Sequence, residues 1–257
     1  MTPEIHGTTS TATNPTPQGG GSKYVFGTAS NDEDLQEIYA FRYRVYAEKM
    51  GRRHIRDADH DKKTIQDGLD ETGCHFTVKH QDRLVGSVRG HLIKNLTPDS
   101  PLWKESLEQY KLAPFVSAFP DGVGFSSRLI IDPDHRQGPV LNRLLVHSFE
   151  AGLRNGVHFG FVQCSPSLVE LYERLGYRRY TDNLVDPVFG YKVPMVLVLR
   201  DQDYLRSIRS PLARILERNA PDASAHPSVL WFNETLFPQS RKSTFRADAF
   251  GKLNAPI

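Results

Sequence analysis

GFSSRLIIDPDHRQGPVLNRLLVHSFEAGLRN, which runs from Gly124 to Asn155, is the stretch that decides the fold. Its first eight residues, 124–131, form a short, mostly apolar run that ends at the turn signal Asp132-Pro133, and this pattern predicts a strand. A basic loop follows over 134–138, and the apolar residues after it recur at helical spacing. A strand that leads through a loop into a helix leaves free backbone N–H groups, which is typical of a site for phosphate or another anion.

The composition indicates a soluble protein with a sizeable core. The chain has 257 residues, of which 39% are hydrophobic and 24% charged. Its 32 basic and 30 acidic residues give a formal net charge of +2, which is too balanced to favour nucleic acid as a partner. Cys74 and Cys164 stand at no metal-ligand spacing, so we expect free thiols in a reducing compartment and no metal site. No apolar run reaches the roughly 18 residues of a membrane span, and no signal peptide is visible, so we expect a cytoplasmic protein.

The order of predicted elements favours one α/β (α+β) domain, with a mixed central sheet flanked by helices. Residues 1–22 contain mainly Thr, Pro, Gly and Asn and are predicted to be a disordered tail. Residues 23–216 follow the order strand, helix, hairpin, strand, helix, strand, helix, strand. Residues 217–257 are rich in Pro and Ser, and we expect an extension that is partly disordered or packed on the domain.

Four local patterns refine this order. Residues 74–79 and 83–93 alternate as two strands joined by a short turn, which predicts a hairpin. The strongly charged residues 52–67 predict a surface loop or a mobile lid. Pro194 places the last strand at an edge or a bulge, and Pro211 should break or kink the closing helix.

Taken in order, these elements resemble the GNAT acyltransferase fold. A helix that ends LYERLGY, as residues 171–177 do here, is common in that family. Four further motifs are similar to the branch that holds acyl-homoserine-lactone synthases and long-chain N-acyl amino acid synthases. They are FRYRVY (41–46), DGLD (67–70), VGSVR (85–89) and SRL (127–129). The resemblance covers residues 26–208.

The resemblance implies that a free amine attacks an acyl thioester, for which a site must supply alignment, donors for the oxyanion and a proton acceptor. The residues matched to acceptor binding are Arg42, Tyr46, Asp67, Asp70, Arg89 and Arg128. On this basis Arg89 and Arg128 hold the acceptor's carboxylate, and Asp67 or Asp70 binds its ammonium group.

The resemblance also implies the catalytic groups. Backbone N–H groups near Ser126, Ser127 and Arg128 would polarise the thioester carbonyl. Tyr172 matches a position that protonates the leaving thiolate in many members.

The donor is expected to be an acyl thioester of acyl carrier protein or of coenzyme A, with no permanently bound cofactor. The residues matched to donor binding are Leu129, Ile130, Ile131, Arg136, Gln137, Gly138 and Val140. The usual pyrophosphate loop of the family is Q/R-x-x-G-x-G/A, but here Pro139 and Leu141 stand at the two glycine positions. Because Pro139 also lacks a backbone N–H, this loop favours acyl carrier protein, whose phosphate makes fewer demands.

We therefore expect an N-acyltransferase that moves a medium or long acyl chain to the amine of an amino acid or a similar small amine. The insertion 98–120 and the strand after it predict an acyl pocket lined by Trp103, Phe115, Phe119 and Phe125. Three alternatives stay open: a lactone synthase that uses S-adenosylmethionine, a short-chain acetyl-coenzyme A enzyme, and a non-catalytic acyl- or partner-binding module. Phe125 and Arg52 replace a Glu and a Trp of the lactone synthases, which argues against the first.

Overall fold

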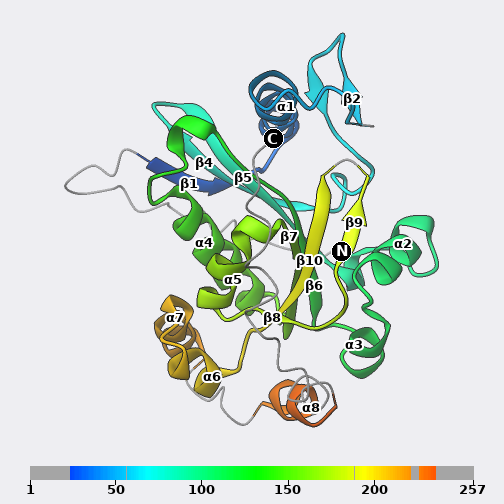
Figure 1. Cartoon of the computed structure of the whole chain (residues 1–257), viewed down its shortest axis with the longest axis vertical. Coiled ribbons are helices and arrows are strands. Elements are labelled where there is room, and N and C mark those ends of the chain that lie inside the picture. Colours follow the sequence, from blue (N-terminus) through cyan, green and yellow to red (C-terminus); the bar gives the residue numbers. More distant parts are fainter. Residues whose placement is uncertain (1–23, 56, 188, 221–225, 236–257) are drawn as a thin grey trace, which may run out of the picture.

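The computed structural model describes residues 24–55, 57–187, 189–220 and 226–235 (Figure 1). The strands are β1 (Tyr24–Thr28), β2 (Ala58–Asp59), β3 (Thr64–Ile65), β4 (Cys74–His80), β5 (Arg83–Leu92), β6 (Val123–Ile131), β7 (Phe159–Cys164), β8 (Arg178–Arg179), β9 (Leu184–Asp186) and β10 (Gly190–Val198). The α-helices are α1 (Asp32–Tyr43), α2 (Pro101–Gln109), α3 (Ala113–Ala118), α4 (Val140–Arg154), α5 (Val169–Leu175), α6 (Gln202–Ser207), α7 (Pro211–Asn219) and α8 (Pro227–Thr235). The predicted disordered tail, residues 1–22, lies outside the described residues.

The strands form one eight-stranded sheet in the order β1-β4-β5-β6-β7-β10-β8, with β9 paired to β10. Neighbouring strands are antiparallel except β6 and β7, which run parallel. This mixed sheet with flanking helices confirms the predicted fold class. None of the helices in the described ranges has the length and apolar composition needed to cross a bilayer.

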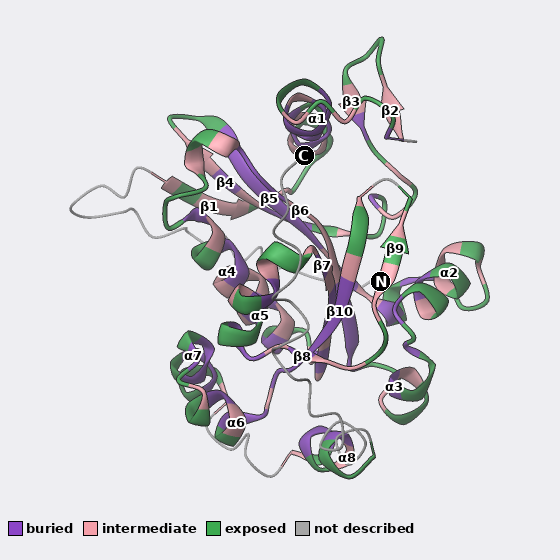
Figure 2. Cartoon of the chain, in the orientation of Figure 1, coloured by how far each residue is buried: buried purple, intermediate pink, exposed green. Residues whose placement is uncertain are grey.

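Helices cover both faces of the sheet (Figure 1). Alternate residues of β10 separate the two cores: Met195 and Leu197 pack with α4, α5, α6 and α7, whereas Val196 and Val198 pack with α3 and α8. The part of β10 that follows the β9 pairing is buried, while its first residues are half-buried or exposed (Figure 2). The exposed start of β10 therefore lies beside the surface where β9 joins it.

Helix α1 leads directly into a π-helical segment, Arg44–Lys49. The helix begins at a capping residue, because the Asn31 side chain accepts a hydrogen bond from the backbone N–H of Asp34 at 2.8 Å. At the other end the backbone N–H of Arg52 donates to the carbonyl of Tyr46 at 2.9 Å. Such π-helical turns are frequent at functional sites, and this one buries Val45, Tyr46 and Ala47.

The prolines and the short turn act largely as the sequence indicates. Gln81 and Asp82 both have positive φ angles, 50° and 58°, which is the two-residue turn of the predicted hairpin. Pro194 lies between the β10 residues that pair with β9 and those that pair with β8, so its missing N–H leaves no gap in either ladder. Pro211 begins α7, which separates the predicted closing helix into α6 and α7.

Two predicted segments can be placed on the structure. Within the charged residues 52–67, β2 and β3 pair as a hairpin, and Ile55 and Ile65 are buried. The predicted domain end at residue 216 falls inside α7. Of the C-terminal extension, α8 packs on the sheet through Val229 and Phe232, and residues 236–257 lie outside the described part.

The sheet opens between β6 and β7. The two strands pair only from Val123 to Phe125, and the pairing ends at Phe125 opposite Phe161. On its other edge β6 carries a bulge, because two steps along β5, from Ser87 to Arg89, match three steps along β6. Arg128 lies in this bulge with a φ of 52°, a left-handed conformation that costs a non-glycine residue about 1–3 kcal/mol. Strained bulges beside an opening are typical of functional sites.

Gly176 provides a test of the packing at the end of α5. Its φ is 110°, and an added Cβ would collide with Leu205. We expect Gly176→Ala to lower the free energy of unfolding by about 2–4 kcal/mol, measured by urea denaturation. Gly156→Ala is the matched control, since Gly156 also has a positive φ, 73°, but no neighbour within 4 Å. A loss in Gly176→Ala no larger than in the control would contradict the close contact with α6.

Candidate active site

Arginines and aspartates from four of the predicted motifs form one network of ion pairs. Arg42 on α1 donates from Nη1 to both carboxylate oxygens of Asp70, at 2.9 and 2.8 Å. Arg89 on β5 donates from Nη1 to Asp70 and to Asp67, each at 2.6 Å. The Nε of Arg89 also donates to the Ser127 hydroxyl at 3.1 Å. The first helix, the DGLD loop, β5 and β6 are thus joined at one point.

Arg128 extends this network to the β2–β3 hairpin. Its Nη2 donates to Asp67 at 2.7 Å and to Asp57 at 2.6 Å, while its Nη1 has no hydrogen-bond partner among the described residues. The three guanidinium groups and the three carboxylates cancel in charge. The guanidinium groups that the sequence assigned to the acceptor's carboxylate are therefore already paired with aspartates.

Burial makes this mutual pairing necessary. Arg42, Asp70 and Arg89 are 1–3% exposed, and an unpaired charge at such a depth costs several kcal/mol. Burial alone would raise the pKa of Asp67, but hydrogen bonds and charge from Arg89 and Arg128 outweigh it and hold that pKa well below its usual range. The Asp70 pKa is lowered in the same way by Arg42. Both carboxylates are therefore ionised at neutral pH.

A cavity of about 640 Å³ lies beside the network. Nine residues named from the sequence line it: Tyr46, Asp67, Arg89, Phe125, Ser126, Ser127, Arg128, Leu129 and Tyr172. Arg42 and Asp70 do not line it, because they are buried behind Asp67 and Arg89 in the chain of ion pairs. They are placed to position the lining residues rather than to touch a ligand.

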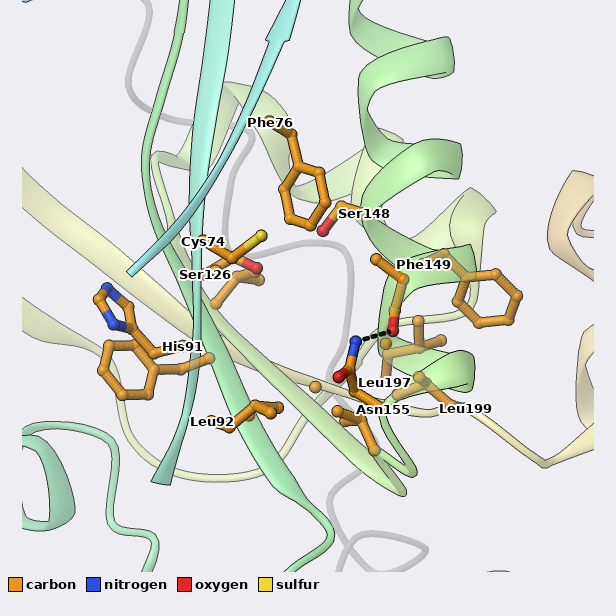
Figure 3. A pocket seen from close by; sticks show the side chains of 18 of the residues that line it. Cys74, Phe76, His91, Leu92, Ser126, Ser148, Phe149, Asn155, Leu197 and Leu199 are labelled. Atoms are coloured by element: carbon orange, nitrogen blue, oxygen red, sulfur yellow. Dashed lines mark hydrogen bonds between the residues drawn. The ribbon is translucent and has the colours of Figure 1, made fainter. Parts of the chain in front are cut away.

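A second, largely apolar cavity of about 210 Å³ lies between α4 and the sheet (Figure 3). At one end Figure 3 shows Cys74, Phe76, Ser126 and Ser148, and at the other Leu92, Asn155, Leu197 and Leu199. Gly90, Gly124, Gly152 and Gly160 also line it, so its space exists where side chains are absent. No part of this cavity except its edge at Phe125 and Ser126 was predicted from the sequence.

The two cavities meet where β6 and β7 separate. Phe125, Ser126 and Val162 line both of them. Because strand pairing ends at Phe125, the backbone groups of β6 beyond it that face β7 have no strand partner in the described sheet. The arrangement joins an apolar cavity, a polar cavity and free backbone donors at one place.

Comparison with known proteins identifies the family of this chain. Residues 37–201, more than half of the chain, match the family of the N-acyl amino acid synthase FeeM. The chain belongs to this family. It is an acyltransferase of the branch that the FRYRVY, DGLD, VGSVR and SRL motifs predicted. A search of curated protein sequences found no match.

Solved structures agree on the fold. FeeM, an N-acyl amino acid synthase from uncultured soil microbes, is 15% identical with a TM-score of 0.55, and the match covers 75% of this chain and 97% of FeeM. BjaI, a CoA-dependent acyl-homoserine lactone synthase, is 16% identical with a TM-score of 0.52, and the match covers 73% and 90%. The lactone synthase LasI is 13% identical with a TM-score of 0.52, and the match covers 70% and 91%.

Two side chains in the larger cavity have pKa values that fix their protonation state. Burial raises the pKa of Tyr172 well above its usual value, so its hydroxyl stays protonated and can act as a proton donor. Burial likewise raises the pKa of Cys164 to about 11, which keeps it a thiol at neutral pH. Cys164 therefore contributes a small apolar surface to the wall of the larger cavity and does not act as a nucleophile.

The predicted donor residues separate into three groups. Leu129 lines the larger cavity, whereas Ile130, Ile131 and Val140 are buried in the core. Arg136 lies in the loop before α4 and donates from Nε to the carbonyl of Ile131 at 3.3 Å. The remaining two, Gln137 and Gly138, are exposed in the same loop.

Lys49, which the sequence did not single out, ties the donor loop to the π-helical segment. Its Nζ lies 2.6 Å from Asp132 and 2.8 Å from Asp134. Lys49 and Asp132 lie more than eighty residues apart in the sequence, so no local pattern indicated this contact.

The aromatic residues assigned to an acyl pocket require a correction. Phe115 and Phe119 contact Phe159 and Trp231 in a buried aromatic cluster, with ring centroids 5.1–5.7 Å apart. Trp103 packs against the same core, and none of the three lines either cavity. Aromatic content predicted a pocket here, but these rings fill their space by packing on one another. Of the four, Phe125 alone lines a cavity.

Asp70 tests the network. Asp70→Asn leaves Arg42 and Arg89 buried with too little negative charge, and we expect it to lower the free energy of unfolding by about 3–5 kcal/mol in urea titrations. Asp99→Asn is the control, because the Asp99 side chain is 82% exposed and lies 4.0 Å from Lys104. We expect a change within about 0.5 kcal/mol there. Equal effects of the two substitutions would show that the network contributes little.

Proposed function

We propose that this acyltransferase moves a medium or long acyl chain from a thioester to the amine of an amino acid or a similar small amine. The observation that supports this most is the junction at Phe125, Ser126 and Val162, where an apolar and a polar cavity meet. Acyl transfer needs an apolar site for the chain and a polar site for the amine, with the carbonyl between them.

The acyl chain is assigned to the smaller cavity. An apolar cavity of roughly 150 Å³ accommodates a six-carbon ring, so a cavity of about 210 Å³ suits a longer chain than acetyl. Leu145, Leu197 and Leu199 supply its apolar walls. This favours a medium or long chain over the short-chain alternative.

The acceptor is assigned to the larger cavity. A neutral amine there attacks the thioester carbon, and the negative charge that forms on the carbonyl oxygen is stabilised by unpaired backbone N–H groups of β6. The nitrogen becomes positively charged as its bond to carbon forms, and it gives one proton to a water molecule in the cavity. The C–S bond then breaks, and the Tyr172 hydroxyl gives its proton to the leaving thiolate. Asp67 and Arg128 hold each other at the wall of this cavity, and the network behind them fixes the bulge from which the β6 donors project.

Acyl carrier protein is the proposed donor, which also places the protein in the cytoplasm, where such thioesters are made. Pro139, at the start of α4, offers no N–H to a pyrophosphate, and the helix has no side-chain cap. Asp132 and Asp134 in the loop before α4 add negative charge, and among the described residues only Lys49 offsets it by direct pairing. A single phosphate near Arg136 suits this loop better than the three phosphate groups of coenzyme A.

The reaction itself is the first test. The purified protein is incubated with acyl-carrier-protein and acyl-coenzyme A thioesters of several chain lengths and a mixture of amino acids, and products are identified by mass spectrometry. We expect N-acyl amino acids, with a higher kcat/KM for the carrier-protein donor, and a kcat about 100-fold lower in Tyr172→Phe. Lactones formed only with S-adenosylmethionine, or turnover of acetyl-coenzyme A alone, would contradict the proposal.

Ser148 tests the place of the acyl chain. Its side chain projects from α4 toward the smaller cavity (Figure 3), so Ser148→Leu should narrow that cavity. We expect kcat/KM to fall about tenfold for the longest accepted donor and to stay unchanged for the shortest. Asn142→Leu, on the exposed surface of the same helix, is the control. A uniform loss over all chain lengths in Ser148→Leu would place the chain elsewhere.

A further inference from the structure

Two cations gather on one aromatic ring at the larger cavity. The Nζ of Lys192, on β10, lies 5.1 Å from the centroid of Phe189, and the guanidinium carbon of Arg52 lies 5.3 Å from it. Phe189 and Lys192 both line the cavity, and Tyr46 contacts Phe189 edge-on at 5.7 Å. Two positive charges thus lie near this ring, which belongs to the turn between β9 and β10.

Neither cation is in an ion pair with a described residue, which distinguishes both from the arginines of the network. Arg89 and Arg128 share Asp57, Asp67 and Asp70, so their charges are cancelled. Lys192 has Asp186 as its acidic neighbour, but that carboxylate accepts the backbone N–H of Phe189 at 2.6 Å and lies outside ion-pair distance of Lys192. Of the three cations that line the cavity, Arg89 and Arg128 are in ion pairs with aspartates, whereas Lys192 is in none with a described residue, although Asp186 also belongs to the lining.

Both cations are held in place. The Arg52 backbone N–H is bonded to the carbonyl of Tyr46 at the end of the π-helical segment, and Lys192 lies in the β9–β10 ladder opposite Leu184. Burial lowers the pKa of Lys192, the charge of Asp186 raises it and the charge of Arg52 lowers it, so Asp186 offsets only part of what burial and the repulsion between the two cations cost. An anion between them relieves that repulsion.

We infer that Lys192, which shares the Phe189 ring with Arg52, binds the carboxylate of the acceptor. This inference rests on the proposed function and names the residue that holds the acceptor's carboxylate. An acceptor carboxylate gains little from guanidinium groups already neutralised by aspartates, and gains a charge-assisted hydrogen bond from an ammonium group without an ion pair. The donor's phosphate is the competing anion, but its proposed site is the loop before α4.

Lys192→Met keeps the apolar stem of the side chain and removes the charge. We expect the KM for the amino acid to rise about 10–100-fold, with the KM for the acyl donor and the kcat/KM for the corresponding amino acid amide unchanged. Lys192→Arg should restore most of the affinity. Lys62→Met removes the same charge at a site 79% exposed and should behave as the wild type.

Calorimetric titration of free amino acids and their amides into the protein without donor separates this inference from the transfer reaction. Binding of an amino acid, but not its amide, that is lost in Lys192→Met supports the inference even if no acyl transfer occurs. Equal losses with acid and amide, a raised KM for the donor, or no binding of any amino acid to the wild type would each overturn it. Normal transfer to amino acids by Lys192→Met overturns it while the proposed function stands.

Discussion

The pairing of Arg42, Arg89 and Arg128 with three aspartates is the constraint on which the site depends. A guanidinium group loses its hydration when it is buried, and only a carboxylate with good geometry offsets that cost. Each aspartate therefore has to lie within hydrogen-bonding distance of its arginine. This requirement fixes the positions of α1, the DGLD loop, β5 and the β6 bulge relative to one another. The left-handed conformation of Arg128 persists because its side chain is anchored to Asp57 and Asp67. Positioning thus comes from charges that are not themselves free for a ligand.

Much of the fold and several of the site residues could be predicted from the sequence. Hydrophobic periodicity, the Asn31 cap and the prolines located the elements, because these signals act over a few residues. The four motifs pointed to residues that do come together. The sequence could not show that their charges pair with each other, since a motif gives the type of a charge but not its partner. Asp57 lies in a charged segment without periodicity, so nothing marked it as the third aspartate.

The smaller, apolar cavity shows a different limit. Aromatic residues in the insertion predicted a pocket, and the structure packs them into solid core instead. Space is left where α4 and the strands carry Gly90, Gly124, Gly152 and Gly160. A cavity depends on what is missing from several distant segments at once, and a pattern within one segment does not reveal that. Composition records which side chains are present, so it indicated apolar surface but not where space is left beside it.

The short pairing of β6 with β7 has a mechanical consequence. Three paired residues of each strand are the only strand-to-strand link between the half of the sheet that holds β1, β4 and β5 and the half that holds β8 and β10, within the described strands. The junction of the two cavities lies at the end of this seam. The two panels are therefore joined by few backbone hydrogen bonds at the seam. Because Phe125, Ser126 and Val162 line both cavities, a widening of the seam changes the shape of the apolar and the polar cavity together.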